Sequence, residues 1–388
     1  MAANGKVNGT ETHDDNYIVA GIDMTDLFPE PFPSDVKTVH LETLSLAKLL
    51  AQDKLEQQRV FENCKKAGFF QLDLTDNEEG VQLLRDAVEC ARLMTKLLPT
   101  MSVEDKRSYK QHDRVGVYSM GYQVYETLSN GQPKYNETVN FPMTEMLDYG
   151  DSSALQLPDW LSPHKEVFKR AMRSGNKIAN IVFNALEVGL QVPPGSISNA
   201  HRIEDPSDDF LRLLRYPGVQ PGQPRDDLGF PAHKDFTSLG ILFTWLGGLQ
   251  LPVSATAPSL TEGTMTGPLD ITEDSWRWVK PVPGTAILNI GDALEVLSNK
   301  VLTSGLHRVV RAPGKQAPHD RYSVLIGTRA ANSFPMKPLQ SPLIPTVIDP
   351  ANVEIAKMTS GEWGTHKIGS FNKWVKARKE RQDVLVMD

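Results

Sequence analysis

Cysteine is scarce in this chain, and the apolar segments that mark membrane or secreted proteins are missing. The two cysteines among 388 residues are Cys64 and Cys90, which do not form a Cys-x-x-Cys pair. We expect both to be free thiols on helices, in a reducing compartment. No apolar run is long enough to cross a membrane, and the first residues lead into polar sequence instead of the apolar core of a signal peptide. The expected location is therefore cytoplasmic.

Basic surface is also lacking. The formal net charge is −7 at pH 7 and the isoelectric point is about 5.8, which argues against a nucleic-acid binder. A short basic run at 373–381 is expected to be a solvated helix face. The chain has no P-loop, no Gly-x-Gly-x-x-Gly after a strand and no Gly-x-Ser-x-Gly elbow. The expected partner is a small-molecule substrate, with no nucleic acid and no membrane, and the oligomeric state stays open.

Composition divides the chain into four parts. Residues 1–16 are polar and predict a disordered tail. Residues 17–200 carry helical and strand patterns and are expected to pack on a core formed by 201–335. Within that core, 252–274 is rich in Ser, Thr, Gly and Pro and too long for a simple connection, so it is either a surface insertion or a lid. Residues 336–388 are expected to form a C-terminal helical extension.

Local patterns predict the secondary structure. The spacing of apolar residues predicts helices at 44–66, 81–98 and 163–190, and 68–72 is typical of a strand. From Phe210 onward, Pro/Gly turns separate short strands that we predict at 211–216, 239–245, 276–280, 285–290, 307–311 and 322–328. Many short strands without interleaved helices indicate a sandwich or barrel.

A histidine and a carboxylate, His233 and Asp235, stand two residues apart at the start of an apolar, strand-like run. Alternate side chains of a strand share a face, so these two are expected to point the same way. Such a pair can hold one face of an octahedral metal if a third ligand arrives from elsewhere. His307 is the candidate third ligand, because 289–299 is typical of a strand, a turn and a short helix that return the chain to the sheet. Two histidines and one carboxylate leave about three positions open, which suits ferrous iron.

Arg321 and Ser323 are also two residues apart in a predicted strand. An arginine can bind a carboxylate through two parallel hydrogen bonds, and a neighbouring hydroxyl can add a third. An arginine buried inside a barrel needs an anionic partner. That partner is either a bound ligand or an internal acid such as Asp292.

These short motifs follow one another in an order that resembles the iron(II)- and 2-oxoglutarate-dependent oxygenases. The likeness is greatest to the branch that includes isopenicillin N synthase and the plant flavonoid and gibberellin oxygenases. It spans residues 37 to 330, roughly, and 64–71 resembles the N-terminal region of that branch. The motifs are His233-x-Asp235, Asn289-Ile-Gly-Asp292, Ser298-Asn299, His307-Arg-Val and Arg321-x-Ser323.

The resemblance implies a mainly β protein with α-helices, in which helices flank a double-stranded β-helix (jelly-roll) core. It implies His233, Asp235 and His307 as the catalytic iron ligands. The implied cofactors are Fe(II), 2-oxoglutarate as co-substrate and O2, with ascorbate as a candidate reductant.

The resemblance also implies a site for the co-substrate. Arg321 and Ser323 match the family's clamp for the distal carboxylate of 2-oxoglutarate, and Tyr216 matches a tyrosine that can bond the co-substrate carboxylate. Leu214 replaces the usual asparagine, so that polar contact is absent. The insertion at 252–274 departs from the plant pattern and resembles fungal members, which often act in secondary metabolism, including alkaloid tailoring.

The implied reaction is oxidation of an unactivated C–H bond of a small molecule, with release of succinate and CO2. The same iron site also permits desaturation, ring closure or ether-bridge formation. An oxidase that does not use 2-oxoglutarate and a non-catalytic binding protein are further alternatives. The tyrosine-rich segment 118–125 and Phe236 are candidates for the substrate pocket, with ordinary packing as the alternative for each.

Overall fold

Short strands and a few long helices make up the described part of the protein, which in this computed structural model comprises residues 17–109, 120–124, 127–128, 133–149, 155–219, 228–253 and 272–369. The strands are β1 (Ile18–Val19), β2 (Ile22–Asp23), β3 (Thr38–Val39), β4 (Thr43–Ser45), β5 (Phe69–Asp73), β6 (Gly121–Val124), β7 (Glu137–Pro142), β8 (Phe210–Tyr216), β9 (Leu228–His233), β10 (Leu239–Thr244), β11 (Leu249–Pro252), β12 (Trp276–Val279), β13 (Thr285–Ile290), β14 (His307–Val310) and β15 (Arg321–Thr328). The helices are α1 (Leu46–Leu50), α2 (Lys54–Lys66), α3 (Glu78–Leu97), α4 (Val103–Lys106), α5 (Met143–Met146), α6 (Lys165–Leu190) and α7 (Asp292–Leu297), and residues 360–369 are also helical.

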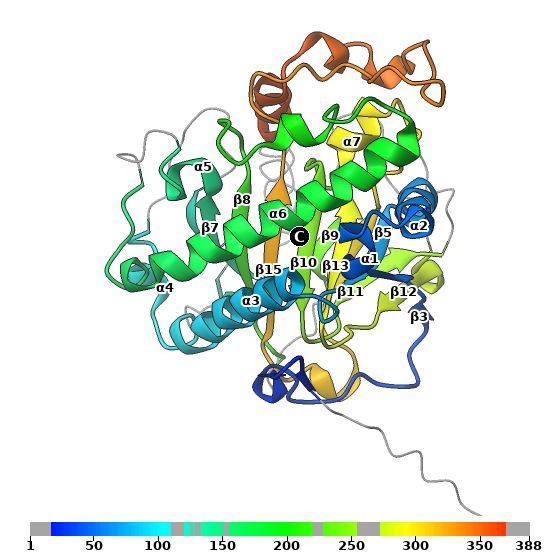
Figure 1. The fold of residues 1–388 in the computed structure, drawn as a ribbon. Coiled ribbons are helices and arrows are strands. Elements are labelled where there is room, and N and C mark those ends of the chain that lie inside the picture. The colour runs from blue at the N-terminus through cyan, green and yellow to red at the C-terminus, as the bar shows by residue number, and fades with distance from the viewer. Residues whose placement is uncertain are drawn as a thin grey trace, which may run out of the picture.

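Two facing sheets form the core. Within the described residues, the larger sheet has the order β4-β5-β13-β10-β15-β8-β7-β6 and the smaller one β3-β12-β11-β14-β9. The long helices α3 and α6 lie across the outer face of the larger sheet (Figure 1), against β8 and β15. This is the predicted class of fold, a mainly β core flanked by helices.

Three predicted segments lie wholly or mostly outside the described residues. They are the tail at 1–16, most of the insertion at 252–274 and the basic run at 373–381. The division of the chain into four parts therefore stays a prediction. No helix in the described ranges has the length and apolar character needed to cross a membrane.

The predicted helices are present, with one difference. The helix expected at 44–66 is split, because Gln52 adopts a left-handed conformation (φ +56°) between α1 and α2. The Asp53 side chain then accepts a hydrogen bond from the backbone N–H of Glu56 (2.9 Å) and caps the start of α2. Cys64 on α2 and Cys90 on α3 are buried free thiols, as predicted.

The six strands predicted after Phe210 are all present, within one residue at each end. Sequence patterns missed β9 and β11. Strand β9 contains Gly229 and Pro231, which are typical of turns, and it lies at the edge of the smaller sheet where a proline is tolerated. Strand β11 has only four residues, too few for a periodic pattern to stand out.

Side chains of β15 point alternately to the two faces of the larger sheet. One face packs against the helices and the other faces the smaller sheet. Val324 and Ile326 are fully buried in the main core, which also contains residues of α3 and α6. Gly175 of α6 lies so close to this face that a Cβ there would come within 2.4 Å of Ile326 Cδ1. Arg321 and Ser323 therefore point to the opposite face, towards the smaller sheet.

A buried cluster of charged side chains joins β6, β7 and β8 on the helix side of the larger sheet. The Glu137 carboxylate accepts hydrogen bonds from Lys106 Nζ (2.5 Å), the Tyr122 hydroxyl (2.5 Å) and Arg215 Nη1 (2.6 Å). Arg215 also pairs with Asp320 at 2.6 Å. Two cations and two anions balance one another, so the buried charges are compensated.

We predict that Glu137→Gln lowers the free energy of unfolding by about 3–5 kcal/mol, because it leaves buried Lys106 without its counter-charge. Urea unfolding measures the change. Glu104, which is 86% exposed, gives a matched control, and Glu104→Gln is expected to change stability by less than about 0.5 kcal/mol. A loss below about 1 kcal/mol for Glu137→Gln would contradict this account.

Candidate active site

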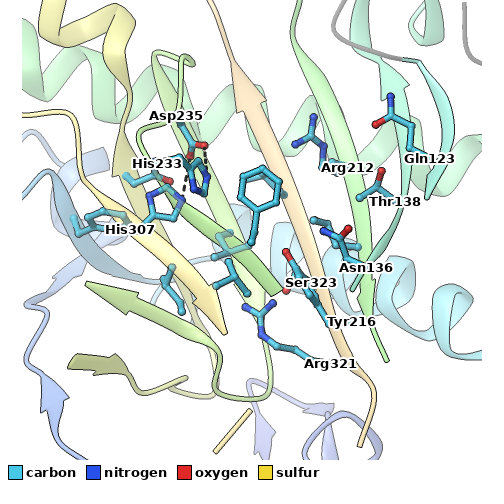
Figure 2. A pocket seen from close by; sticks show the side chains of 18 residues that line it. Gln123, Asn136, Thr138, Arg212, Tyr216, His233, Asp235, His307, Arg321 and Ser323 are labelled. Carbon is cyan, nitrogen blue, oxygen red and sulfur yellow. Dashed lines mark hydrogen bonds and ion pairs between the residues drawn. The ribbon is translucent and has the colours of Figure 1, made fainter. Parts of the chain in front are cut away.

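His233, Asp235 and His307 lie together at one end of the cavity between the sheets (Figure 2), with one ligand atom of each within 4.8 Å of the others. Nε2 of His233 is 3.5 Å from Asp235 Oδ1, and Nε2 of His307 is 3.9 Å from Asp235 Oδ2. Both histidines are buried and Asp235 is partly buried. Two imidazole nitrogens and a carboxylate at this spacing can hold one divalent metal ion on a single face.

Antiparallel pairing places the two histidines side by side. The register of β9 and β14 makes His233 and His307 direct partners, and their ring centroids are 4.1 Å apart. Nδ1 of His233 lies 2.8 Å from the Pro231 carbonyl oxygen, and Nδ1 of His307 lies 3.0 Å from that of Gly305. A carbonyl only accepts, so each Nδ1 carries a hydrogen, and Nε2, the ring nitrogen nearer Asp235, is the one left to bind a metal.

Asp235 does not lie on a strand, because β9 ends two residues before it, and the strand-face explanation of its direction is therefore wrong. Its carbonyl oxygen accepts from the backbone N–H of Asp292 (2.6 Å), and its Oδ2 accepts from Asn289 Nδ2 (2.9 Å). Gly291 approaches so closely that a Cβ there would lie 2.0 Å from the Thr237 carbonyl oxygen. The Asn289-Ile-Gly-Asp292 motif thus positions the Asp235 carboxylate.

Charge and burial fix the protonation of the cluster. Burial raises the pKa of the Asp235 carboxyl, but attraction to His307 and His233 outweighs it, so this pKa lies well below its usual range. Burial lowers the pKa of His307 to about 4, and repulsion from His233 acts in the same direction. At neutral pH Asp235 is ionised and His307 is neutral, the states in which carboxylates and imidazoles bind metals.

Arg321, Ser323 and Tyr216 lie together at another part of the same cavity (Figure 2). The guanidinium carbon of Arg321 is 5.0 Å from the Tyr216 ring centroid. Arg321 is 3% and Ser323 1% exposed, and burial lowers the pKa of Arg321. Arg321 Nε and Ser323 Oγ have no hydrogen-bond partner among the described residues. Because buried polar atoms are normally paired, this pair fits a carboxylate ligand.

The internal-acid alternative for Arg321 is wrong for Asp292. Asp292 Oδ2 is 3.0 Å from Lys367 Nζ, and within the described ranges Arg321 forms no ion pair with an acid. The arginine in this region that does pair with acids is Arg215, which contacts Glu137 and Asp320 on the other face of β8.

Apolar side chains make up part of the cavity wall. Leu214, Tyr216 and Val309 form a buried apolar cluster in its wall, with Phe230 and Leu325 packed against them. Leu214 thus contributes apolar surface to the cavity.

Sequence reasoning missed four polar residues that line the cavity. Gln123, Asn136, Thr138 and Arg212 come from β6, β8 and the segment at and before β7. They form no short motif in the sequence, because only the register of three strands places them side by side. Strand alternation was the available signal, but these strands are short.

The aromatic candidates for the substrate pocket have other surroundings. Tyr122 points to the helix side and bonds Glu137, while Tyr118 and Tyr125 lie outside the described residues. The Phe236 ring packs 4.1 Å from the guanidinium carbon of Arg329, and it does not line the cavity described above.

Comparisons with known proteins agree on one family. The model of the 2OG-Fe(II) oxygenase superfamily matches residues 207–326. An Aspergillus fumigatus protein described as a 2-oxoglutarate-dependent dioxygenase is 76% identical over 383 residues, which cover 98% of this chain and 99% of the relative. A Caulobacter crescentus protein described as a 2OG-Fe(II) oxygenase family member is similar in structure, with a TM-score of 0.62 at 21% identity, over 86% of this chain and 100% of that one. JOX2 in complex with 2OG, Fe and JA has a TM-score of 0.57 at 21% identity, over 81% and 82% of the two chains.

The solved structures support the jelly-roll fold, and the Aspergillus fumigatus relative establishes the family because its high identity extends over almost the whole chain. The predictions of the family, of the fold and of an oxidoreductase are confirmed, whereas the use of ascorbate stays a prediction. This chain belongs to the 2OG-Fe(II) oxygenase superfamily and is a 2-oxoglutarate-dependent dioxygenase, a family that uses Fe(II), 2-oxoglutarate and O2.

Proposed function

We propose that this dioxygenase oxidises an unactivated C–H bond of a small metabolite, with His233, Asp235 and His307 as the Fe(II) ligands. Arg321 and Ser323, beside Tyr216, would hold the distal carboxylate of 2-oxoglutarate. One observation carries the proposal: Arg321 Nε and Ser323 Oγ, two buried donors without a partner in the described part of the chain, share a cavity with the cluster of two histidines and a carboxylate. The donor types on each side match the two groups that the family binds.

Neighbouring groups of the protein orient the three metal ligands in this proposal. The carbonyls of Pro231 and Gly305 hold the imidazoles of His233 and His307 with Nε2 available, and Asn289 holds the Asp235 carboxylate. Bound Fe(II) supplies the redox chemistry that couples O2 and 2-oxoglutarate to substrate oxidation, with succinate and CO2 as by-products.

The clamp contributes orientation and a dry environment. Arg321 and Ser323 would hold the far carboxylate of 2-oxoglutarate, beside the apolar cluster around Leu214 and Val309 in the cavity wall. Side chains of that cluster exclude water from the space between the two polar ends. Interactions between charges are stronger there than in bulk water.

Small secondary metabolites are the proposed substrates, and the Aspergillus fumigatus relative supports a fungal setting. Alkaloid tailoring is one case of such chemistry. Desaturation, ring closure and ether-bridge formation begin with the same oxidation of a C–H bond and are alternatives for the product. Mass analysis of the product separates hydroxylation, which adds one oxygen atom, from the other three reactions, each of which removes two hydrogen atoms.

The decisive test is whether succinate forms together with the oxidised product. Purified protein is supplied anaerobically with Fe(II), 2-oxoglutarate and candidate metabolites, then exposed to O2. The proposal expects succinate and oxidised substrate in equal amounts. Product without succinate would instead support an oxidase that does not use 2-oxoglutarate.

We predict that His233→Ala and Asp235→Ala each abolish turnover and weaken Fe(II) binding at least tenfold, because the remaining two ligands cannot close the face of the metal. Anaerobic dialysis with iron analysis measures binding, and circular dichroism checks the fold. His40 is exposed, so His40→Ala is the matched control. Full activity in either ligand variant defeats the metal assignment.

We predict that Arg321→Ala weakens 2-oxoglutarate binding by about 2–5 kcal/mol, the range for removing one partner of a buried charge pair. Anaerobic calorimetry with the metal-loaded protein measures this affinity. Arg107 is 56% exposed on the surface, and Arg107→Ala is expected to leave the affinity unchanged. An unaltered affinity in Arg321→Ala would rule out the clamp.

A further inference from the structure

A lysine stands between two of the candidate metal ligands, and its partner lies on α7. Lys234 separates His233 from Asp235 in the sequence. Its Nζ lies 3.1 Å from Glu295 Oε1 and 3.3 Å from Glu295 Oε2. The two side chains are 18% and 21% exposed, and neither of them lines the cavity. The proposed function assigns no task to this ion pair.

The Glu295 carboxylate also holds the segment that leads to the third ligand. Glu295 Oε1 accepts a hydrogen bond from the backbone N–H of Ser304 (3.0 Å). Ser304 is 1% exposed, so this bond pairs a backbone group that is shielded from water. The next residue is Gly305, whose carbonyl oxygen lies 3.0 Å from Nδ1 of His307. One carboxylate therefore contacts both the segment of Lys234 and the segment before His307.

Backbone bonds make α7 a fixed base for Glu295. The N–H of Asp292 donates to the carbonyl oxygen of Asp235 (2.6 Å), and the N–H of Ala293 donates to that of Thr237 (3.2 Å). Four of the six residues of α7 are buried in the main core. Because a packed core resists displacement, Glu295 keeps its position relative to the turn that carries Asp235.

The metal ligands lie where the strand pairing ends. His233 is the last residue of β9 and His307 is the first of β14, so their pair closes the ladder. Register shifts also interrupt the pairing further along, at Val309 and Val310. Strand ends open more readily than strand interiors. Glu295 links the chain just after β9 to the chain just before β14, which would oppose opening at this end.

We propose that Glu295 is a positioning residue for the metal ligands. By joining Lys234 to the backbone of Ser304, it holds the open end of the β9–β14 pair together and keeps Asp235 and His307 at a fixed separation. It acts through these neighbours and not by contact with the metal or the substrate. This inference rests on the proposed function, because it takes His233, Asp235 and His307 as the ligands.

Co(II) tests the proposal, because its visible absorption spectrum depends on how its ligands are arranged. The natural protein and Glu295→Ala are titrated anaerobically with Co(II), and the spectrum is recorded at saturation. We expect Glu295→Ala to weaken Co(II) binding by about tenfold or more, as is typical when a group that orients metal ligands is removed, and to change the spectrum. An unweakened affinity or an unchanged spectrum overturns the proposal.

Glu295→Gln separates position from charge. The amide keeps an oxygen that can accept hydrogen bonds from Lys234 and Ser304, but it carries no charge. We expect the spectrum of the natural protein and an affinity closer to the natural protein than to Glu295→Ala. If Glu295→Gln behaves like Glu295→Ala, the charge of Glu295 supports metal binding and its position does not, which overturns the proposal.

Glu56 provides a matched control for a purely structural role. Its carboxylate likewise pairs with a cation, Arg59 (2.8 Å), and accepts from a backbone N–H, that of Ser45 (2.5 Å), but it does not line the cavity. Glu56→Ala is expected to lower stability in urea and to leave the affinity and spectrum of Co(II) unchanged. A Co(II) spectrum that changes in Glu56→Ala as it does in Glu295→Ala contradicts a specific role of Glu295.

Lys234→Met keeps the test decisive if Glu295→Ala does not fold. Methionine retains the apolar length of the side chain but breaks the same link from its other side. We expect weaker Co(II) binding and a changed spectrum in this variant as well. An unchanged spectrum overturns the proposal.

Metal binding by the natural protein separates the two levels of inference. Failure of the natural protein to bind Co(II) and Fe(II) contradicts the metal assignment, and with it the role of Glu295. Binding that is lost in His233→Ala but unaltered in Glu295→Ala contradicts only the role of Glu295.

Discussion

The antiparallel pairing of His233 with His307 is the constraint on which the site depends. Because they are direct partners on β14 and β9, two residues 74 positions apart in the sequence present their rings to the same point. Backbone carbonyls two residues upstream then orient both rings. The smaller sheet thus also sets the spacing of the two candidate histidine ligands. No loop has to be ordered for the two imidazoles to meet.

Side chains along a strand alternate between two faces. In the larger sheet, one face stabilises the fold and the other carries the residues of the candidate site. On β15 and β8, one set of positions packs against α3 and α6 in the main core, and the other set lines the cavity. A shift of register by one residue would bury Arg321 under the helices and expose core side chains to the cavity. The ion cluster of Glu137, Lys106, Arg215 and Asp320 lies on the helix side and joins β7, β8 and the start of β15, so it opposes such a shift.

Local sequence pattern was sufficient for much of the fold and for the candidate ligands, because His233, Asp235, Arg321 and Ser323 belong to short motifs. Local pattern was insufficient where the direction of a side chain depends on tertiary contacts. Asp235 points to the histidines through Asn289 and the backbone of the following turn, not through strand alternation. The cavity residues Gln123, Asn136, Thr138 and Arg212 lie on or beside three strands and form no motif. The groups that orient the histidines are main-chain carbonyls, which every residue has.

Arg321 shows how the protein tolerates a buried charge before a ligand arrives. Its guanidinium lies over the Tyr216 ring, and the electron-rich face of an aromatic ring partly replaces the lost hydration. The adjoining apolar cluster around Leu214 and Val309 keeps the local dielectric low. In such surroundings a guanidinium without a hydrogen-bond partner costs free energy, and its pairing with a carboxylate is correspondingly favourable. In the proposed function, the carboxylate of 2-oxoglutarate would supply that pairing.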